Sequence, residues 1–147
     1  KNTELDNLHL TLKFLGEVDE KGLEKIEKQL AKIKANKFHA IIDSIGVFSP
    51  NFIKIVWLRF EGANELQNAI DNSLRDIFSC EKRFMSHLTI ARVKFIKDKE
   101  KFLDGLKKIK IEKMKFFVGS FKIKESTLTP NGPVYKTLKE YNLENIN

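Results

Sequence analysis

The chain has 147 residues, 41% of them hydrophobic and 32% charged, which is enough for one domain with a buried core. No apolar run approaches the roughly 20 residues that cross a membrane, and a single cysteine, Cys80, excludes an intrachain disulfide. A net charge of +7 favours an anionic partner such as nucleic acid, although a surface rich in Lys, Glu and Ile is also typical of thermophiles.

Hydrophobic residues recur with the period of a strand or of an amphipathic helix along most of the chain. Strands outnumber helices and several are joined by short turns, which indicates an α+β fold with antiparallel sheet. The repeated order of strand, helix and strand suggests two similar halves. In chain order we expect a strand at 7–15, a helix at 19–36, strands at 38–48 and 53–60, a helix at 63–79, a strand at 86–93, a helix at 98–109, one long or bent strand at 115–129 and a final strand at 134–142.

One short pattern occurs twice, in the strands expected at 7–15 and 86–93. The two copies are His9-Leu10-Thr11-Leu12 and His87-Leu88-Thr89-Ile90. Side chains alternate faces along a strand, so each histidine shares a face with the threonine two residues later. Two imidazoles can take and give a proton, and two hydroxyls can donate hydrogen bonds to phosphate oxygens. The pattern therefore favours acid–base chemistry on a phosphate.

With their flanks, the two copies resemble the paired His-x-Thr-x motifs of the 2H phosphoesterases, in particular the RNA 2′,3′-cyclic phosphodiesterase branch, also described as 2′-5′ RNA ligase-like. The first copy continues as Lys13-Phe14-Leu15-Gly16 and the second as Ala91-Arg92. Two further segments resemble that branch, and the resemblance runs over nearly the whole chain in the expected order. These segments are Ser44-Ile45-Gly46-Val47-Phe48 and Ser126-Thr127-Leu128-Thr129-Pro130, the latter followed by Gly132-Pro133-Val134-Tyr135.

The resemblance implies a fold for residues 1–147: a single bilobal domain whose two antiparallel sheets face each other across a central cleft. Helices would lie on the outside, and each lobe would supply one His-x-Thr motif. In that family a strand and a helix precede the first motif, whereas this chain begins at Lys1. We therefore expect the natural protein to carry residues before Lys1, because a sheet without that strand would expose an unpaired edge.

The resemblance also implies the reaction, in which water attacks a 2′,3′-cyclic phosphate and leaves a 2′-phosphomonoester. We expect His9 as the general acid and His87 as the general base, although the residues alone do not fix that order. Thr11, Thr89 and Arg92 would bind the phosphate. The substrate would be RNA or a nucleotide, and the enzyme a cytoplasmic monomer with no membrane partner and no cofactor.

Two other functions use the same motifs. A 2′-5′ RNA ligase would replace water by a 5′-hydroxyl, and a non-catalytic module would bind nucleotide or RNA without turnover. Binding alone needs hydrogen-bond donors and not a proton relay, so two intact histidines favour an enzyme. No His, Cys, Asp or Glu cluster has metal-ligand spacing, and no phosphate-binding loop for ATP is present, so we expect metal-independent chemistry.

Three further residues lie near the motifs. Phe48 would either stack on a nucleobase or pack in the core. Strict alternation places Arg92 on the face opposite His87, and only a twist or bulge would return it to the phosphate. Lys13 shares the face of His9 by alternation, and we favour a solvated position at the strand's end over a role at the phosphate.

Overall fold

The structure, a computed structural model, describes residues 1–146 and divides into two compact units. The first unit comprises residues 1–11, 40–62 and 85–116, and the second comprises 12–39, 63–84 and the chain from 117 onward. None of the helices in the described chain is long and apolar enough to cross a membrane. The elements are η1 (Leu5–Asn7), α1 (Glu20–Leu30), β1 (Phe38–Val47), β2 (Ile55–Glu61), α2 (Asn64–Leu74), β3 (His87–Arg92), α3 (Lys99–Lys108), β4 (Met114–Val118), β5 (Ser120–Thr129) and β6 (Gly132–Asn142).

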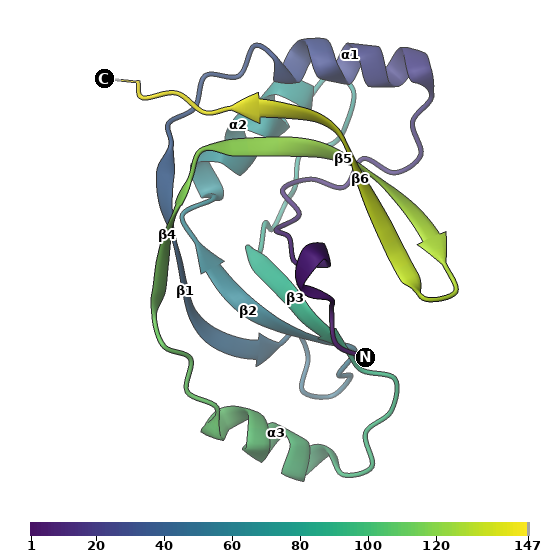
Figure 1. The fold of residues 1–147 in the computed structure, drawn as a ribbon, viewed down its shortest axis with the longest axis vertical. Helices are drawn as coiled ribbons and strands as arrows, with labels where there is room; N and C mark the ends of the chain where they lie inside the picture. Colours follow the sequence, from purple (N-terminus) through teal and green to yellow (C-terminus); the bar gives the residue numbers. More distant parts are fainter. Residues whose placement is uncertain (147) are drawn as a thin grey trace. The chain divides into compact units, whose positions relative to one another are not determined.

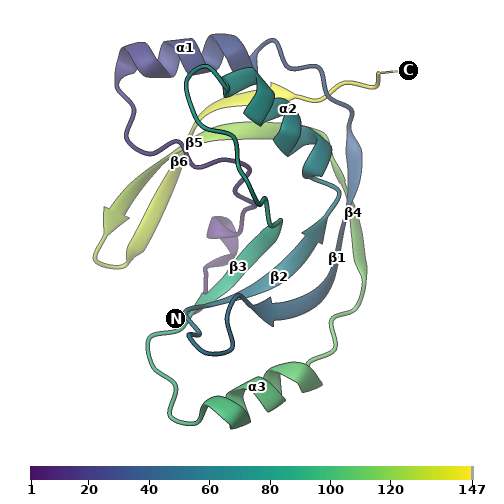
Figure 2. The ribbon, with the colours of Figure 1, turned by 180° about the vertical axis from the view of Figure 1, so that it is seen from behind.

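The strands form a four-stranded sheet in the order β3-β2-β1-β4 and a separate β5–β6 hairpin. In the first unit β2 pairs antiparallel with both β1 and β3, as Figure 1 shows. The predicted α+β class with two antiparallel sheets is therefore confirmed. Helix α3 lies in the connection from β3 to β4, which Figure 2 shows from behind.

The register of β1, β2 and β3 sorts their side chains onto two faces. Directly opposed residues of an antiparallel pair share a face, and faces alternate along each strand. Trp57 of β2 lies opposite Gly46 of β1 and Thr89 of β3. The same face carries Arg59 opposite His87, and we call it the polar face. The other face is apolar and carries Ile42, Ile45, Val47, Val56, Leu58, Phe60 and Leu88.

The main hydrophobic core of the second unit lies between its two long helices and the β5–β6 hairpin (Figure 1). Asp19 caps α1 by accepting a hydrogen bond from the Gly22 N–H, which satisfies a donor that the helix itself leaves unpaired. Each helix buries one apolar stripe, and the rings of Phe121 and Tyr141 stack with centroids 5.0 Å apart. The buried members of this core are Ile26, Leu30, Leu66, Ile70, Leu74, Phe121, Ile123, Tyr141 and Leu143.

The prediction of a regular strand at 7–15 is wrong. Residues 5–7 form the turn η1, so the N-terminal segment pairs with β3 in two separate places. Asn2 bridges Ala91, and after the turn Leu10 bridges Leu88, both antiparallel. The turn interrupts the ladder, because residues within it direct their backbone groups at each other and not at β3.

Other differences concern the ends of elements. Helix α1 ends at Leu30 and not at residue 36, since the Lys32 and Ile33 N–H groups donate to carbonyls three residues earlier in a tight final turn. Helix α2 ends at Leu74 and not at residue 79 for a similar reason, a three-residue turn from Ile77. The expected bent strand at 115–129 is interrupted at Gly119, so its parts β4 and β5 belong to different sheets.

Candidate active site

Both His-x-Thr pairs lie in the first unit. His87 and Thr89 belong to β3, and the segment with His9 and Thr11 lies beside that strand. The bridge between Leu10 and Leu88 is antiparallel. Continuing this pairing by one residue on each side places His9 beside Thr89 and Thr11 beside His87. All four then share the polar face. The structure thus brings the two His-x-Thr pairs together. Both lie in the same unit, whereas the family resemblance implied one pair in each lobe.

Each motif histidine is held by the same local contact. His9 Nδ1 lies 2.7 Å from the carbonyl oxygen of Asn7, and His87 Nδ1 lies 2.7 Å from that of Met85. In both cases the carbonyl belongs to the residue two positions earlier. A carbonyl oxygen only accepts, so Nδ1 carries the hydrogen and donates it. The proton that each imidazole gains or loses is therefore on Nε2, which is the arrangement that a pair of acid–base groups requires.

One aromatic side chain, Phe48, contacts His87 directly, and a second, Trp57, packs against Phe48. The ring of Phe48 makes a T-shaped contact with His87, with centroids 4.8 Å apart and planes at 90°. Phe48 also contacts Trp57, at 5.7 Å between centroids. A Cβ added to Gly46 would lie 2.7 Å from the Trp57 ring, so only glycine leaves room for the indole at this point. Phe48 remains 46% exposed, which leaves part of its ring available to a ligand.

A bulge in β3 decides the position of Arg92. Trp57 pairs with Thr89 but Val56 pairs with Ala91, so one residue, Ile90, is extra in β3. Arg92 then lies opposite Ile55, which shares the face of Trp57 by alternation along β2. The extra residue reverses the alternation and brings Arg92 onto the polar face. Its side chain is exposed there, two positions along β2 from the pair of Trp57 and Thr89.

A residue that the sequence-based prediction missed, Arg59, lies directly opposite His87 on the polar face. Its guanidinium forms ion pairs with Glu61 and, at 3.9 Å, with Asp43. Asp43 follows Ile42, which pairs with Phe60, so the register of β1 with β2 places Asp43 beside Arg59. Only the pairing register could reveal Arg59, because no motif surrounds it in the sequence.

Lys13 is not solvated, contrary to the sequence-based expectation. Its side chain is 4% exposed and its Nζ donates to Asp71 Oδ1 at 2.5 Å and to the Ser79 carbonyl at 2.8 Å. Asp71 also accepts from the Gln67 side chain and the Glu81 N–H. Burial raises the pKa of Asp71, but these hydrogen bonds and the charge of Lys13 outweigh it, so the pKa is lowered. Lys13 is therefore a buried structural partner within the second unit.

The family model described as LigT like Phosphoesterase matches residues 1–57 and 60–135. The chain belongs to the LigT-like phosphoesterase family. This confirms the resemblance that the paired motifs indicated. Within residues 1–146, no group of three or more His, Cys, Asp or Glu side chains is placed to hold a metal ion.

Relatives of this LigT-like chain align with nearly all of it. A protein of Methanocaldococcus jannaschii, named RNA 2′,3′-cyclic phosphodiesterase, is 40% identical over 96% of this chain and 83% of its own. One of Archaeoglobus fulgidus with the same name is 35% identical, over 96% and 82%. Among solved structures, TT0787 of Thermus thermophilus aligns with a TM-score of 0.78 and 25% identity, covering 99% of this chain and 82% of its own. Escherichia coli LigT complexed with 3′-AMP aligns with a TM-score of 0.70 at 24% identity, covering 97% and 80%.

Proposed function

We propose that the chain hydrolyses RNA or nucleotides that end in a 2′,3′-cyclic phosphate and leaves a 2′-phosphomonoester. The observation that carries the proposal is the matched anchoring of His9 and His87, each through Nδ1 to a backbone carbonyl. Identical tethers set both imidazoles to exchange protons at Nε2. The names of the curated relatives support the same substrate class.

The proposed reaction needs one neutral and one protonated imidazole. Nε2 of neutral His87 takes a proton from water as the water oxygen bonds to phosphorus. The bond from phosphorus to the 3′ oxygen breaks, and protonated His9 delivers its Nε2 proton to that oxygen. Both histidines exchange states in one turnover, and a proton exchange with solvent restores them.

Three side chains on the polar face would hold the phosphate during this exchange. The hydroxyls of Thr11 and Thr89 flank the histidines and would donate to the non-bridging oxygens as negative charge develops on them. Arg92, returned to the polar face by the bulge, would supply a permanent positive charge.

Phe48 would bind the nucleobase beside the reacting phosphate. Its ring contacts His87 at 4.8 Å between centroids yet stays 46% exposed. A base stacked on the exposed part would therefore lie next to the general base. Aromatic stacking is a common way to hold an unpaired RNA base.

The decisive assay offers a nucleoside 2′,3′-cyclic phosphate to the purified protein in the presence of a chelator and without ATP. We expect turnover to the 2′-phosphomonoester, unchanged by the chelator, and loss of turnover in His9→Asn and His87→Asn. Addition of an RNA with a 5′-hydroxyl then tests for the ligase reaction. Binding of the nucleotide without turnover would instead identify a binding module and refute the proposal.

A further inference from the structure

We propose that a second surface of the first unit binds the single-stranded RNA that leads to the cyclic phosphate end. The surface consists of Phe52, Lys54, Lys94 and Phe95, and we call it the hairpin-end surface. The identity of the RNA end rests on the proposed function, but the surface itself rests on separate observations. With the hairpin-end surface, an RNA chain would bind more tightly than a mononucleotide and would be the preferred substrate.

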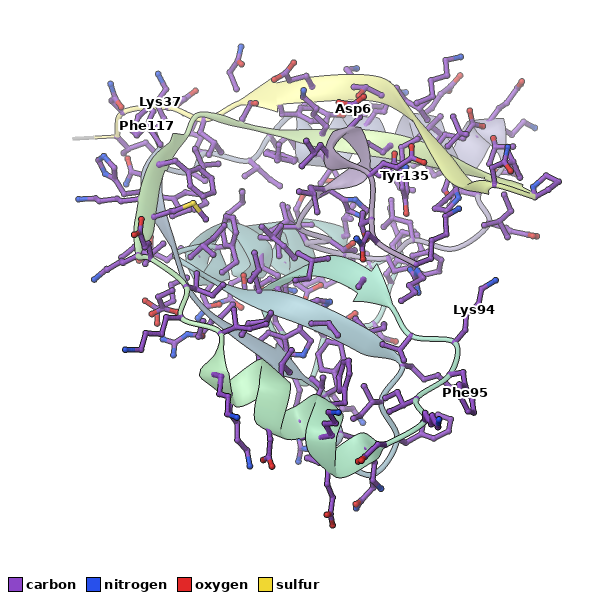
Figure 3. All side chains as sticks on the ribbon, turned by 60° about the horizontal axis from the view of Figure 1, so that its bottom comes forward. Asp6, Lys37, Lys94, Phe95, Phe117 and Tyr135 are labelled. Atoms are coloured by element: carbon purple, nitrogen blue, oxygen red, sulfur yellow. The ribbon has the colours of Figure 1, made fainter. Side chains whose placement is uncertain are left out.

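The hairpin-end surface joins two segments that are far apart in the sequence. The Val93 N–H donates to the Lys54 carbonyl at 2.8 Å, so the β1–β2 turn lies beside the segment that leaves β3. Phe52 lies two residues before Lys54, and Phe95 two residues after Val93. Figure 3 shows Lys94 and Phe95 projecting from the connection between β3 and α3.

Two large aromatic rings on this surface are exposed where a folded chain would ordinarily bury them. Phe52 is 69% exposed and Phe95 is 83% exposed. Lys54 Nζ lies 4.8 Å from the centroid of the Phe52 ring, which places a positive charge beside a stacking face. Phe95 also lines an open hollow with Phe102 and with three lysines at 97, 99 and 101, although Asp98 and Glu100 line it too.

Exposed aromatic rings next to lysines are the combination that binds single-stranded nucleic acid. Every base has a face that can stack, and lysines follow the phosphates between the bases. The net charge of +7 suits the same partner. An apolar protein partner would offer no negative charge to Lys54 and Lys94. RNA offers bases to the phenylalanines and phosphates to the lysines, so it is the occupant that the surface favours.

The hairpin-end surface begins one residue beyond the end of the polar face at which Arg92 lies. Strand β3 runs from His87 to Arg92, and Arg92 lies opposite Ile55, one residue after Lys54. Because of the bulge, His87 and Arg92 are separated by four residues of β2, which is roughly 13 Å at about 3.3 Å per residue. A mononucleotide held at the motifs would end close to Arg92, whereas a chain of several nucleotides would extend past it to Lys54 and Lys94.

Binding of RNA oligonucleotides of one, two, four and six nucleotides tests the surface. Each oligonucleotide ends in a 2′-phosphate, the expected product, so that none is consumed during calorimetry. Wild-type affinity should rise with length. Phe52→Ala/Phe95→Ala should weaken the longest oligonucleotide by about 5- to 150-fold for each base that is no longer stacked, and leave the mononucleotide unchanged.

The lysines are tested by the salt dependence of the same binding. Lys54→Ala/Lys94→Ala should lower the slope of log affinity against log salt by about 1.4, two contacts at roughly 0.7 each for a single strand. Lys21→Ala/Lys25→Ala, which removes the same charge from the exposed side of α1, should leave the slope unchanged. Phe117→Ala, another exposed ring at 57%, is the matched control for the aromatic pair.

The two proposals fail in different ways. Turnover of a nucleoside cyclic phosphate, combined with equal affinity for short and long RNA, overturns the surface and leaves the function intact. An equal change of the salt slope in Lys21→Ala/Lys25→Ala and in Lys54→Ala/Lys94→Ala also overturns the surface. If affinity rises with RNA length and Phe52→Ala/Phe95→Ala abolishes this rise, the surface is supported even when no cyclic phosphate is turned over. Only the proposed function then fails. Unchanged melting temperatures of the variants would show that they fold.

Discussion

Replacing Lys13 by Ala should destabilise the second unit by about 3–5 kcal/mol, the usual cost of leaving one charge of a buried pair alone. Lys13 and Asp71 are 4% and 7% exposed at their side chains, and their charged atoms lie 2.5 Å apart. Without the ammonium, Asp71 keeps only Gln67 and the Glu81 N–H as donors. A loss of this size is comparable with a domain's whole stability of roughly 5–15 kcal/mol, and should lower the melting temperature by roughly 6–20 °C.

The pH dependence of unfolding provides a second signature of the same pair. The pKa of Asp71 is lowered in the folded protein, so the unfolded state binds the proton more tightly. The stabilisation is therefore fully present above the ordinary carboxyl pKa of about 3.9 and is lost as the pH falls through the lower folded pKa. Asp71→Asn should remove this part of the acid sensitivity.

Urea unfolding between pH 3 and pH 7 measures both effects. Lys107→Ala removes an exposed partner of Asp104, at 3.5 Å, and should change stability by less than about 1 kcal/mol. Lys13→Met/Asp71→Leu removes both buried charges and should recover most of the loss. A Lys13→Ala protein as stable as Lys107→Ala, with the acid sensitivity of the wild type, would refute this account of the pair.

Three further predictions concern the polar face. Activity should rise and fall with pH, and His9→Ala or His87→Ala should each reduce the rate by at least ~10²-fold, with the double variant little worse; a flat pH–rate profile would contradict the two-histidine mechanism. Gly46→Ala should lower the free energy of unfolding in urea by about 1–3 kcal/mol, because its Cβ would overlap the Trp57 ring, and an unchanged value would disprove that packing. Arg92→Ala should lower kcat/KM by about 10- to 150-fold, the loss of one hydrogen bond to a charged group, and Arg92→Lys should retain part of it; equal activity in both would exclude a phosphate contact.

The sequence was most informative where local pattern decides the structure. The amphipathic stripes of α1 and α2 were predicted correctly, as were the β1–β2 hairpin and the β3 strand that carries His87. In each case a hydrophobic period and a turn residue agree, and the tertiary structure only completes what they specify.

Features that depend on pairing between segments far apart in the chain could not be predicted from the sequence pattern. The position of Arg92 depends on one extra residue in β3, which alternation alone cannot reveal. Arg59 lies opposite His87 only because of the register of β2 with β3. Lys13 looked solvated because its partner, Asp71, is 58 residues away along the chain. The expected strand at 7–15 gave way to a turn and isolated bridges, since the pairing edge of β3 and not the local pattern fixed its shape.

The central claim is that His9 and His87 act together on a 2′,3′-cyclic phosphate. Hydrolysis of a nucleoside 2′,3′-cyclic phosphate in ¹⁸O-labelled water, followed by ³¹P NMR, tests it most directly. We predict a 2′-phosphomonoester carrying one ¹⁸O from water, formed at least ~10²-fold more slowly by His9→Ala and by His87→Ala. A 3′-phosphomonoester product, or wild-type rates in either histidine variant, would contradict the account.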